Sequence, residues 1–477
     1  MKDSQYLPII FVCGYAGTQK DVESRVEDPF YGFNKGSSHV RVGEQGNTQK
    51  FFFESPLLRL IKDHGYLTVF EAETQKIILK NKSEQARKTI WIYRYYDITS
   101  ESFDQPGGIR LEMEDIAKGL REFINNVKQQ TNADKVNLIA YSMGGLVCRS
   151  LIQKIYPDNK EKAADHIDKF FTYGAPHGGI YFALGGGILE SLRDQFGWNN
   201  SDDFGPVRMY EYLTPQAEKK ASVPPDFDYQ SFQGKFPEDR AFCIVGTNAK
   251  DYPEAFGIAQ VAVGPQSDGL VQIQKAYVKG THRAYIHRSH GGSYGMLNSE
   301  EGYQNLQRFF FGDVKVKLSL TNVELRDLDK NFYQMEVRVA IRGLPSVIHE
   351  QSIAHNCPIT LELTRPKPTP LFTAFLVPRY SATADNTSRY VIRLALHSYK
   401  KQQDWLFDRN LDQVPIWSDY LIFDVQSKDN KYKATYSWIS QSREPINGFS
   451  TQVPLPINGK AVLGQNAAVL FEIYDWK

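Results

Sequence analysis

Long hydrophobic runs and paired cysteines are both missing from this sequence. No apolar stretch approaches the about 20 residues that a membrane-spanning helix needs. The four cysteines lie far apart in the sequence, at Cys13, Cys148, Cys243 and Cys357. They form no Cys-x-x-Cys pair, and no histidine stands at zinc-ligand spacing from them. We therefore expect a soluble, cytoplasmic protein with free thiols, no bound metal and no transmembrane helix.

An excess of charge of either sign is lacking too. Lys and Arg number 56 against 55 Asp and Glu, which leaves a formal net charge of +1. Such a chain has no general field to hold nucleic acid or an anionic membrane, so any lipid contact would be local and apolar. The glycine-rich segments 14–17 and 185–187 fit neither Gly-x-Gly-x-x-Gly nor Gly-Lys-Ser/Thr. We expect no cofactor and no nucleic-acid partner.

The 477 residues, 41% of them hydrophobic, can bury more core than one domain usually holds. From Leu7 to about Gly312, short apolar runs alternate with helical patterns, which is typical of a mostly parallel sheet with helices on both faces. The expected strands are 8–12, 66–70, 89–94, 136–140, 170–173 and 241–245. A helix is expected where apolar residues recur at helical spacing, at Met113, Ile116, Leu120, Phe123 and Val127. Further helices are expected after Ser142 and over 299–310.

The pattern changes after Gly312. Apolar and polar residues alternate over 314–320 and 333–341, which is typical of half-buried strands. Similar runs, separated by Pro, Gly, Asn and Asp turns, recur at 359–363, 371–377, 390–396, 420–425, 432–438 and 469–474. About eight strands without a helix between them predict an all-β, antiparallel sandwich domain over 313–477, after an α/β domain over 1–312.

Residues 136–147, Val-Asn-Leu-Ile-Ala-Tyr-Ser-Met-Gly-Gly-Leu-Val, carry an apolar strand to a serine and continue into a helix. A sharp strand-to-helix turn that presents a nucleophile holds it in a strained backbone conformation, so small residues are needed two positions before and after it. Ala140 and Gly144 supply them around Ser142. The pattern predicts a nucleophile elbow, and the alternative is an ordinary strand-to-helix turn.

This segment resembles the elbow of α/β-hydrolase lipases, in particular bacterial lipases whose elbow begins with Ala in place of Gly. Residues 172–179, Thr-Tyr-Gly-Ala-Pro-His-Gly-Gly, are similar to the Thr-Pro-His-Gly-Gly turn of lipases and of the inositol-deacylase and lecithin acyltransferase branch. The resemblance spans about residues 7–312. It implies an α/β-hydrolase fold with helices on both faces of the sheet and a catalytic Ser142.

A serine hydroxyl needs a histidine to take its proton and a carboxylate to orient that histidine. In this fold the chain order is Ser, acid, His. Residues 267–271, Ser-Asp-Gly-Leu-Val, resemble the segment that carries the acid in bacterial lipases, which implies Asp268. The alternative is that Asp268 only caps a turn before Gly269.

The expected base is His290, in a Ser- and Gly-rich loop just before the last helix of the domain, where related lipases place it. His287 and His282 are the competing candidates. His177 precedes the acid in the chain and so breaks the expected order. We therefore interpret His177 as structural.

Two backbone N–H groups must stabilise the negative charge that forms on the substrate oxygen. One is expected from Met143. The resemblance implies that the other comes from Tyr15, in the turn after the first strand, where lipases carry His-Gly followed by an aromatic or apolar residue. Cys13 replaces the family histidine, which should matter little because the backbone supplies the donor.

The N-terminal residues also fit a short secretory signal, since Lys2 is followed by the apolar segment 7–13 and the small residues Ala16 and Gly17. We favour the strand, because the same segment is needed in the core and cleavage near Ala16 would delete half of the expected oxyanion hole. We therefore expect no signal peptide.

Residues 180–239 stand where a minimal hydrolase needs only a short connection, so we expect them to cover the site as a lid. The apolar residues expected to contact the substrate are Phe182, Leu184, Ile188, Leu189 and Leu192. A second insertion, 21–55, is rich in aromatic residues. The alternative for both insertions is a packed cap without substrate contact. An apolar lid indicates an apolar acyl chain.

Together these features predict a serine hydrolase for the carboxylic ester of a lipid or another apolar acyl group. Two alternatives stay open, an acyltransferase with the same triad and a degenerate hydrolase fold used as a binding module. By analogy with lipases that end in such a domain, the β-rich tail suggests a membrane surface or a protein partner. A purely structural tail is the alternative.

Overall fold

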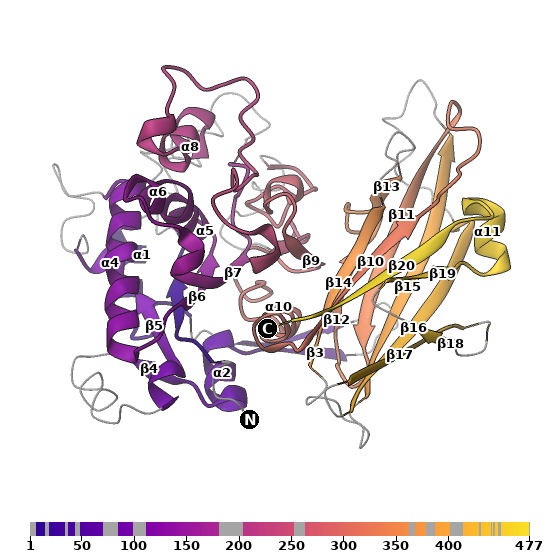
Figure 1. Ribbon diagram of the computed structural model, residues 1–477, viewed down its shortest axis with the longest axis horizontal. Coiled ribbons are helices and arrows are strands. Elements are labelled where there is room, and N and C mark those ends of the chain that lie inside the picture. Colours follow the sequence, from indigo (N-terminus) through magenta and orange to yellow (C-terminus); the bar gives the residue numbers. More distant parts are fainter. Residues whose placement is uncertain are drawn as a thin grey trace. The chain divides into compact units, whose positions relative to one another are not determined.

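The computed structural model describes residues 6–14, 19–33, 37–42, 48–69, 84–98, 111–180, 204–251, 263–361, 368–377, 387–400, 414–428, 431–439, 441, 444–446 and 450–476. The chain forms two compact units, one of Met1–Arg283 with Arg288–Tyr303 and one of Ala284–His287 with Gln304–Lys477. Figure 1 shows strands and helices interleaved in the first unit and long paired strands in the second.

The first unit contains six strands of a seven-stranded sheet and the start of the seventh. Its strands lie in the order β4 (Leu67–Val69), β5 (Thr89–Tyr93), β1 (Ile9–Val12), β6 (Val136–Tyr141), β7 (Ile167–Tyr173), β8 (Ala241–Gly246) and β9 (His282–Ile286). Each pairing from β4 to β8 is parallel. Strands β1 and β6 pair at the centre and are almost completely buried, as expected for strands that are covered on both faces. Because neighbouring parallel strands end at the same edge, the turns after β1 and β6 meet there.

All six strands expected in this unit are present, and β9 is an additional one. Its sequence, His-Arg-Ala-Tyr-Ile, begins with two polar residues and leaves only a short apolar run. That run is too short for the alternation between apolar and polar residues to stand out.

The helices of this unit follow the predicted apolar patterns. Helix α4 (Met113–Thr131) buries the expected stripe except Phe123, which is half-buried, and Ile124 lies in the core instead. Phe123 packs on the rings of Trp91 and Tyr93, with centroid distances of 6.3 and 5.5 Å. Helix α5 (Gly144–Ser150), the helix expected after Ser142, packs beside α4 (Figure 1).

The two insertions contain further elements. The segment 21–55 holds most of α1 (Gln19–Glu27) and the antiparallel hairpin of β2 (Ser37–Val42) and β3 (Thr48–Phe53). It leads into α2 (Pro56–His64), where Ser55 Oγ accepts the N–H of Leu57 at 3.1 Å and so caps the helix. The segment 180–239 contains α8 (Pro206–Leu213) in its described part.

The second unit contains two antiparallel sheets. One has the order β14 (Thr369–Leu376), β10 (Val314–Thr321), β20 (Ala468–Asp475) and β19 (Ser450–Pro454). The other has the order β12 (Val347–Gln351), β11 (Asn331–Ile341), β15 (Thr387–Lys400), β16 (Trp417–Lys428), β17 (Lys431–Trp438) and β18 (Glu444–Ile446), with β13 (Ile359–Leu361) also paired to β11. The Phe423 ring of β16 and the Phe471 ring of β20 are 5.5 Å apart between centroids, so the sheets pack face to face. The predicted sandwich is confirmed.

The eight strands expected in the tail are present, and the short strands β12, β18 and β19 are additional. The expectation of no helix here was wrong. Helix α11 (Ile457–Leu463) lies between β19 and β20, just after Pro456 and just before Gly464, whose φ is 106°. Proline and glycine, which suggested only turns, here bound a short helix.

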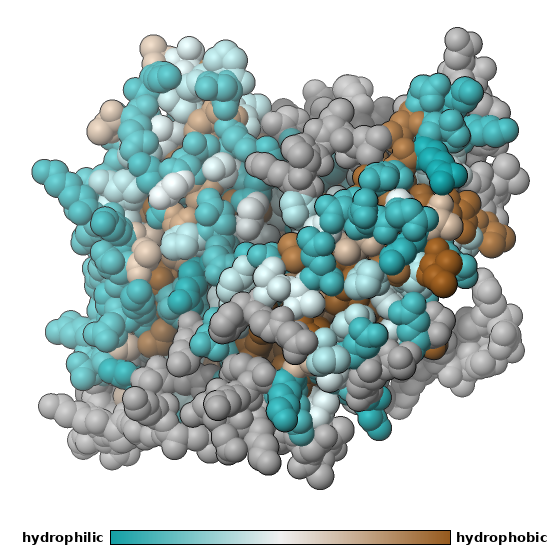
Figure 2. Space-filling model, turned by 45° about the vertical axis from the view of Figure 1, so that its right-hand side comes forward, coloured by the Kyte–Doolittle hydropathy of each residue, from teal (hydrophilic) through white to brown (hydrophobic). Residues whose placement is uncertain are grey.

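The surface agrees with the balanced composition. Figure 2 shows one face, on which hydrophilic side chains predominate over the described surface and hydrophobic ones occupy smaller areas. Within the described ranges, no helix combines the length and hydropathy that crossing a membrane requires. The four cysteines are free and buried.

Candidate active site

Ser142 lies in the sharp turn between β6 and α5. Its φ of 53° is in the left-handed region, which residues with a side chain seldom adopt. Its backbone N–H donates to the Tyr173 carbonyl at 2.9 Å. A Cβ atom on Gly144 would overlap the carbonyl oxygens of Val12 and Cys13, which are backbone atoms with little freedom to move. The turn therefore has the strain and the close packing of the predicted elbow.

Asp268 lies in a turn between β8 and β9. Its Oδ1 accepts the N–H groups of Leu270 at 3.0 Å and Val271 at 2.7 Å. Its Oδ2 lies 2.9 Å from His290 Nδ1. The residue is only 1% exposed, so the carboxylate is shielded from water. The geometry thus combines both predicted contacts of Asp268, a turn cap and a partner for the histidine.

His290 connects this carboxylate to Ser142. Its Nε2 lies 3.0 Å from Ser142 Oγ, and its backbone N–H donates to the Asp268 carbonyl at 2.8 Å. A proton on Nδ1 that points at a carboxylate leaves the Nε2 lone pair facing the serine hydroxyl. The three side chains form one hydrogen-bonded chain in which the hydroxyl can lose its proton to the imidazole.

The competing histidines make other contacts. The ring of His287 stacks on that of His355, with centroids 3.6 Å apart and planes at 5°. His282 Nε2 lies 2.9 Å from Asp239 Oδ1. The histidine that the structure brings to Ser142 is His290, at 3.0 Å from Nε2 to Oγ.

His177 is fully buried in the turn after β7, where its Nε2 lies 3.1 Å from Thr172 Oγ1. Burial, and then the nearby Arg149 guanidinium, hold the pKa of His177 well below its usual range. Arg149 is itself buried and donates to the His177 carbonyl at 2.6 Å and to the Ser231 carbonyl at 2.9 Å. Burial lowers the pKa of Arg149 to about 10, so it stays charged at neutral pH. These contacts fit the structural role expected for His177.

The loop that carries His290 is fixed at both ends. Before it, Arg288 binds the carboxylate of Glu301 with Nη2 at 2.8 Å and Nε at 3.1 Å. After it, Ser299 Oγ accepts the N–H of Gly302 at 3.0 Å, at the start of α10 (Glu300–Phe311). Such a bidentate pair and cap restrain a loop whose glycines would otherwise leave it flexible.

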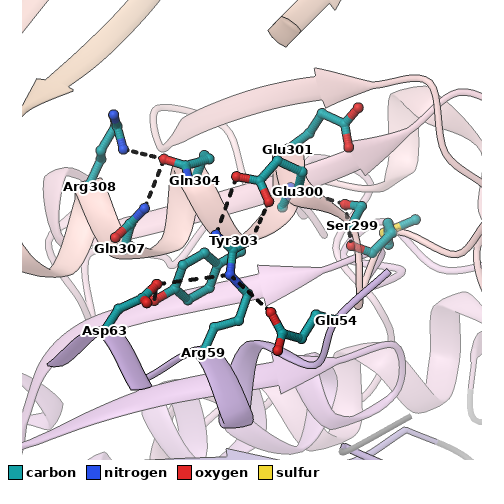
Figure 3. Close-up of polar contacts among 12 residues, drawn as sticks. Glu54, Arg59, Asp63, Ser299, Glu300, Glu301, Tyr303, Gln304, Gln307 and Arg308 are labelled. Atoms are coloured by element: carbon teal, nitrogen blue, oxygen red, sulfur yellow. Dashed lines mark hydrogen bonds and ion pairs between the residues drawn. The ribbon is translucent and has the colours of Figure 1, made fainter. Parts of the chain in front are cut away.

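The start of α10 is in turn tied to α2. Figure 3 shows Arg59 of α2 between carboxylates on three sides, those of Glu54, Asp63 and Glu300. Its guanidinium carbon lies 3.8 Å from the centroid of the Tyr303 ring. The Tyr303 hydroxyl also donates to Asp63 at 2.9 Å. The helix that follows the histidine loop is therefore held by ion pairs and by a cation–π contact.

Tyr141, Arg25 and Tyr95 donate hydrogen bonds near the site but were not selected from the sequence. The Tyr141 hydroxyl donates to the His290 carbonyl at 2.9 Å. The Gly14 carbonyl, in the turn after β1, accepts from Arg25 Nη1 at 3.0 Å and from the Tyr95 hydroxyl at 3.2 Å. No motif carries these long-range contacts, so sequence reasoning had no signal for them.

Of the other expected site residues, Met143 is described by the structure and the rest are not. Met143 begins the turn into α5, with φ −55° and ψ −29°, and its N–H is the first expected oxyanion donor. Tyr15, the second expected donor, lies outside the described residues. So do the expected lid residues Phe182, Leu184, Ile188, Leu189 and Leu192. All these roles stay predictions. In the part of the chain that the structure describes, no group of three or more His, Cys, Asp or Glu side chains could hold a metal ion.

The family model of palmitoyl protein thioesterases matches residues 74–199, a span that contains Ser142. A search of curated proteins found no match. Among solved structures, a mature lipase from Bacillus licheniformis is 14% identical and has a TM-score of 0.35, with 64% of this chain and 92% of that chain covered. Phospholipase PlaB from Legionella pneumophila is 12% identical and has a TM-score of 0.34, with 83% and 90% covered.

A thioesterase from the prodiginine biosynthetic pathway of Streptomyces coelicolor is 13% identical and has a TM-score of 0.24, with 63% of this chain and 87% of that chain covered. The predicted fold rests on closer observations, namely the parallel strand order from β4 to β8 and the elbow between β6 and α5. These observations show that the first unit has the α/β-hydrolase fold, and the family-model match shows that residues 74–199 are similar to palmitoyl protein thioesterases.

Proposed function

We propose that the chain is a serine ester hydrolase that works through an acyl-serine intermediate. In this proposal Ser142 is the nucleophile, His290 the general base and Asp268 the acid that orients it. The observation that carries the proposal is the continuous contact from Ser142 Oγ to His290 Nε2, 3.0 Å, and from His290 Nδ1 to Asp268 Oδ2, 2.9 Å. A buried Ser-His-Asp chain that begins at an elbow serine fits acyl transfer to the serine.

The proposed reaction has an acylation step and a deacylation step. Ser142 Oγ attacks the acyl carbonyl while its proton moves to His290 Nε2, and the C=O π electrons move to the oxygen. The Met143 N–H, with a second N–H expected from Tyr15, stabilises that oxyanion. When the tetrahedral intermediate collapses, His290 gives the proton to the leaving alcohol. Water, deprotonated by His290, then attacks the acyl carbon. The bond from that carbon to Ser142 Oγ breaks, the acid leaves, and His290 returns the proton to Oγ.

We further propose an apolar acyl group as the substrate, as in lipases, phospholipases and carboxylesterases. The support is the predicted apolar lid, together with the similarity to the thioesterase family model. That match also favours a second candidate, hydrolysis of acyl thioesters, because it includes the proposed nucleophile. The two candidates share the acyl-enzyme and differ only in the leaving group.

A chain-length series tests the substrate class. Each buried methylene contributes about 0.8 kcal/mol, so an apolar site should raise kcat/KM by orders of magnitude from p-nitrophenyl acetate to octanoate. We expect this rise in the wild type, its loss in Ser142→Ala, and its retention in Ser150→Ala, a control at a buried serine of α5. A flat series that still requires Ser142 would contradict the proposed apolar acyl group but not the proposed serine hydrolase.

Matched octanoyl oxygen esters and thioesters separate the two leaving groups, since the better substrate shows the higher kcat/KM at equal acyl length. Product analysis with and without added glycerol separates hydrolysis from acyl transfer. We expect free octanoate in both mixtures. An octanoyl glycerol product in excess over octanoate would instead assign an acyltransferase.

A further inference from the structure

Tyr141 is the residue before Ser142, and it contacts His290, which is far from it in the sequence. Its hydroxyl donates to the His290 carbonyl at 2.9 Å, across a separation of 149 residues. The rings of Tyr141 and His290 lie 5.2 Å apart between centroids, at 32°. The same side chain thus reaches both the backbone and the face of the imidazole residue.

Tyr141 also borders the turn after β1. A Cβ atom added to Gly14 would lie 3.3 Å from Tyr141 Cδ1 and 2.8 Å from Ser142 Cβ. The phenol ring therefore lies next to Gly14, the residue before the expected oxyanion donor Tyr15. Tyr141 therefore lies between Ser142, the loop that carries His290 and Gly14.

Hydrogen bonds restrain the His290 backbone at both its N–H and its carbonyl. The N–H of His290 is fixed by the Asp268 carbonyl at 2.8 Å, and its carbonyl by the Tyr141 hydroxyl. The next two residues are Gly291 and Gly292, and glycine leaves a backbone free to adopt many conformations. Because Tyr141 belongs to the buried strand β6, its hydroxyl restrains the position of the His290 carbonyl.

We propose that Tyr141 is a positioning residue that holds His290 at the distance and orientation required to take the proton of Ser142. The inference rests on the function proposed above. Tyr141 itself need not touch the reacting atoms. A histidine that moves by a fraction of an ångström or rotates loses the aligned Ser142 contact, and misalignment acts on the chemical step more than on substrate binding.

The test compares two Tyr→Phe variants that each remove one hydroxyl-to-carbonyl hydrogen bond. Tyr141→Phe removes the bond to His290. The control, Tyr66→Phe, removes the bond from the Tyr66 hydroxyl to the Leu7 carbonyl, 3.0 Å, at the opposite end of the sheet from Ser142. We expect Tyr141→Phe to lower kcat on p-nitrophenyl octanoate about tenfold with KM unchanged. Tyr66→Phe should leave both constants within about twofold.

A second readout excludes a purely structural explanation. Circular dichroism defines an assay temperature at which both variants are folded, and the rate of fluorophosphonate labelling is then measured there. A general loss of stability would affect the two variants alike, whereas positioning predicts slower labelling of Tyr141→Phe alone.

The possible outcomes separate this inference from the function on which it depends. An active wild type with an equally active, equally labelled Tyr141→Phe would overturn the positioning role and leave the hydrolase intact. Equal losses in both Tyr→Phe variants would also overturn it. A wild type that neither turns over esters or thioesters nor takes the label would overturn the proposed function, and the inference with it.

Discussion

At the scale of single residues, the orientation of His290 depends on Asp268, whose two carboxylate oxygens accept from different partners. Oδ1 accepts two turn N–H groups, from Leu270 and Val271, and Oδ2 faces His290 Nδ1. In Asp268→Asn the turn would retain the amide oxygen, so the NH2 group would face Nδ1. The imidazole would then carry its proton on Nε2, where it cannot accept the hydroxyl proton of Ser142.

We therefore predict that Asp268→Asn lowers kcat about 10³- to 10⁴-fold while KM changes little. Steady-state kinetics on the octanoyl ester measures this. Asp228→Asn is the control, since Asp228 pairs with Lys279 at 2.8 Å on the surface and should leave kcat unchanged. A kcat for Asp268→Asn within about threefold of the wild type would exclude the proposed tautomer control.

How far single residues can be predicted depends on the range of their contacts. Ser142 could be proposed because an elbow needs small neighbours within two positions, and Asp268 and His290 because each lies in a short segment that resembles one in lipases. Tyr141 could not, because its hydrogen bond joins residues 149 positions apart and leaves no local pattern. Phe123 was expected in the core from helical spacing, but the register of α4 turns Ile124 inward instead.

At the scale of elements, the turn after β7 places His177 beside α5, the helix that follows Ser142. Burial and the Arg149 guanidinium hold the pKa of His177 well below its unfolded value of about 6.5. The unfolded chain then binds more protons as the pH falls below 6.5, so the stability from this residue is complete above that pH and is lost on acidification.

We predict that the free energy of unfolding falls between pH 6.5 and 5, with a contribution from His177 of up to about 1.4 kcal/mol per pH unit. Urea denaturation at several pH values measures the slope. His177→Gln, which can still bond to Thr172, should give a shallower slope because it has no titrating group. Identical slopes for the variant and the wild type would contradict the assignment.

Elements with long, regular patterns were predicted best. The buried strands β1 and β6 and the amphipathic helix α4 each carry enough residues for their period to be clear. The short strands β9, β12, β18 and β19 do not, and pairing with neighbours rather than local sequence determines them. Helix α11 was missed because its seven residues stand among strands and are bounded by Pro and Gly.

At the scale of the whole molecule, we propose that residues 1–312 form the hydrolase domain and 313–477 the sandwich domain. The second half of α10 nevertheless clusters with the second unit. Within that unit the Phe309 ring lies 5.2 Å from Phe375 and 5.5 Å from Trp476, and Trp476 Nε1 donates to the Phe309 carbonyl at 2.8 Å.

We therefore predict that a chain ending at Gly312 aggregates, because the fully buried Phe309 would lose its ring partners and be exposed. Size-exclusion chromatography of the truncated and full-length chains measures this. A monomeric 1–312 chain with the kcat/KM of the full-length protein would show instead that the sandwich is dispensable for folding.

The most direct test of the account is covalent labelling of the native chain with a fluorophosphonate, followed by mass spectrometry of the peptides. The proposed mechanism predicts about one label per chain, on Ser142, and no label on Ser142→Ala or on heat-denatured protein. An unlabelled native chain would contradict the catalytic assignment and favour a degenerate fold used for binding. A label on another residue, or one that persists in Ser142→Ala, would show that the nucleophile lies elsewhere.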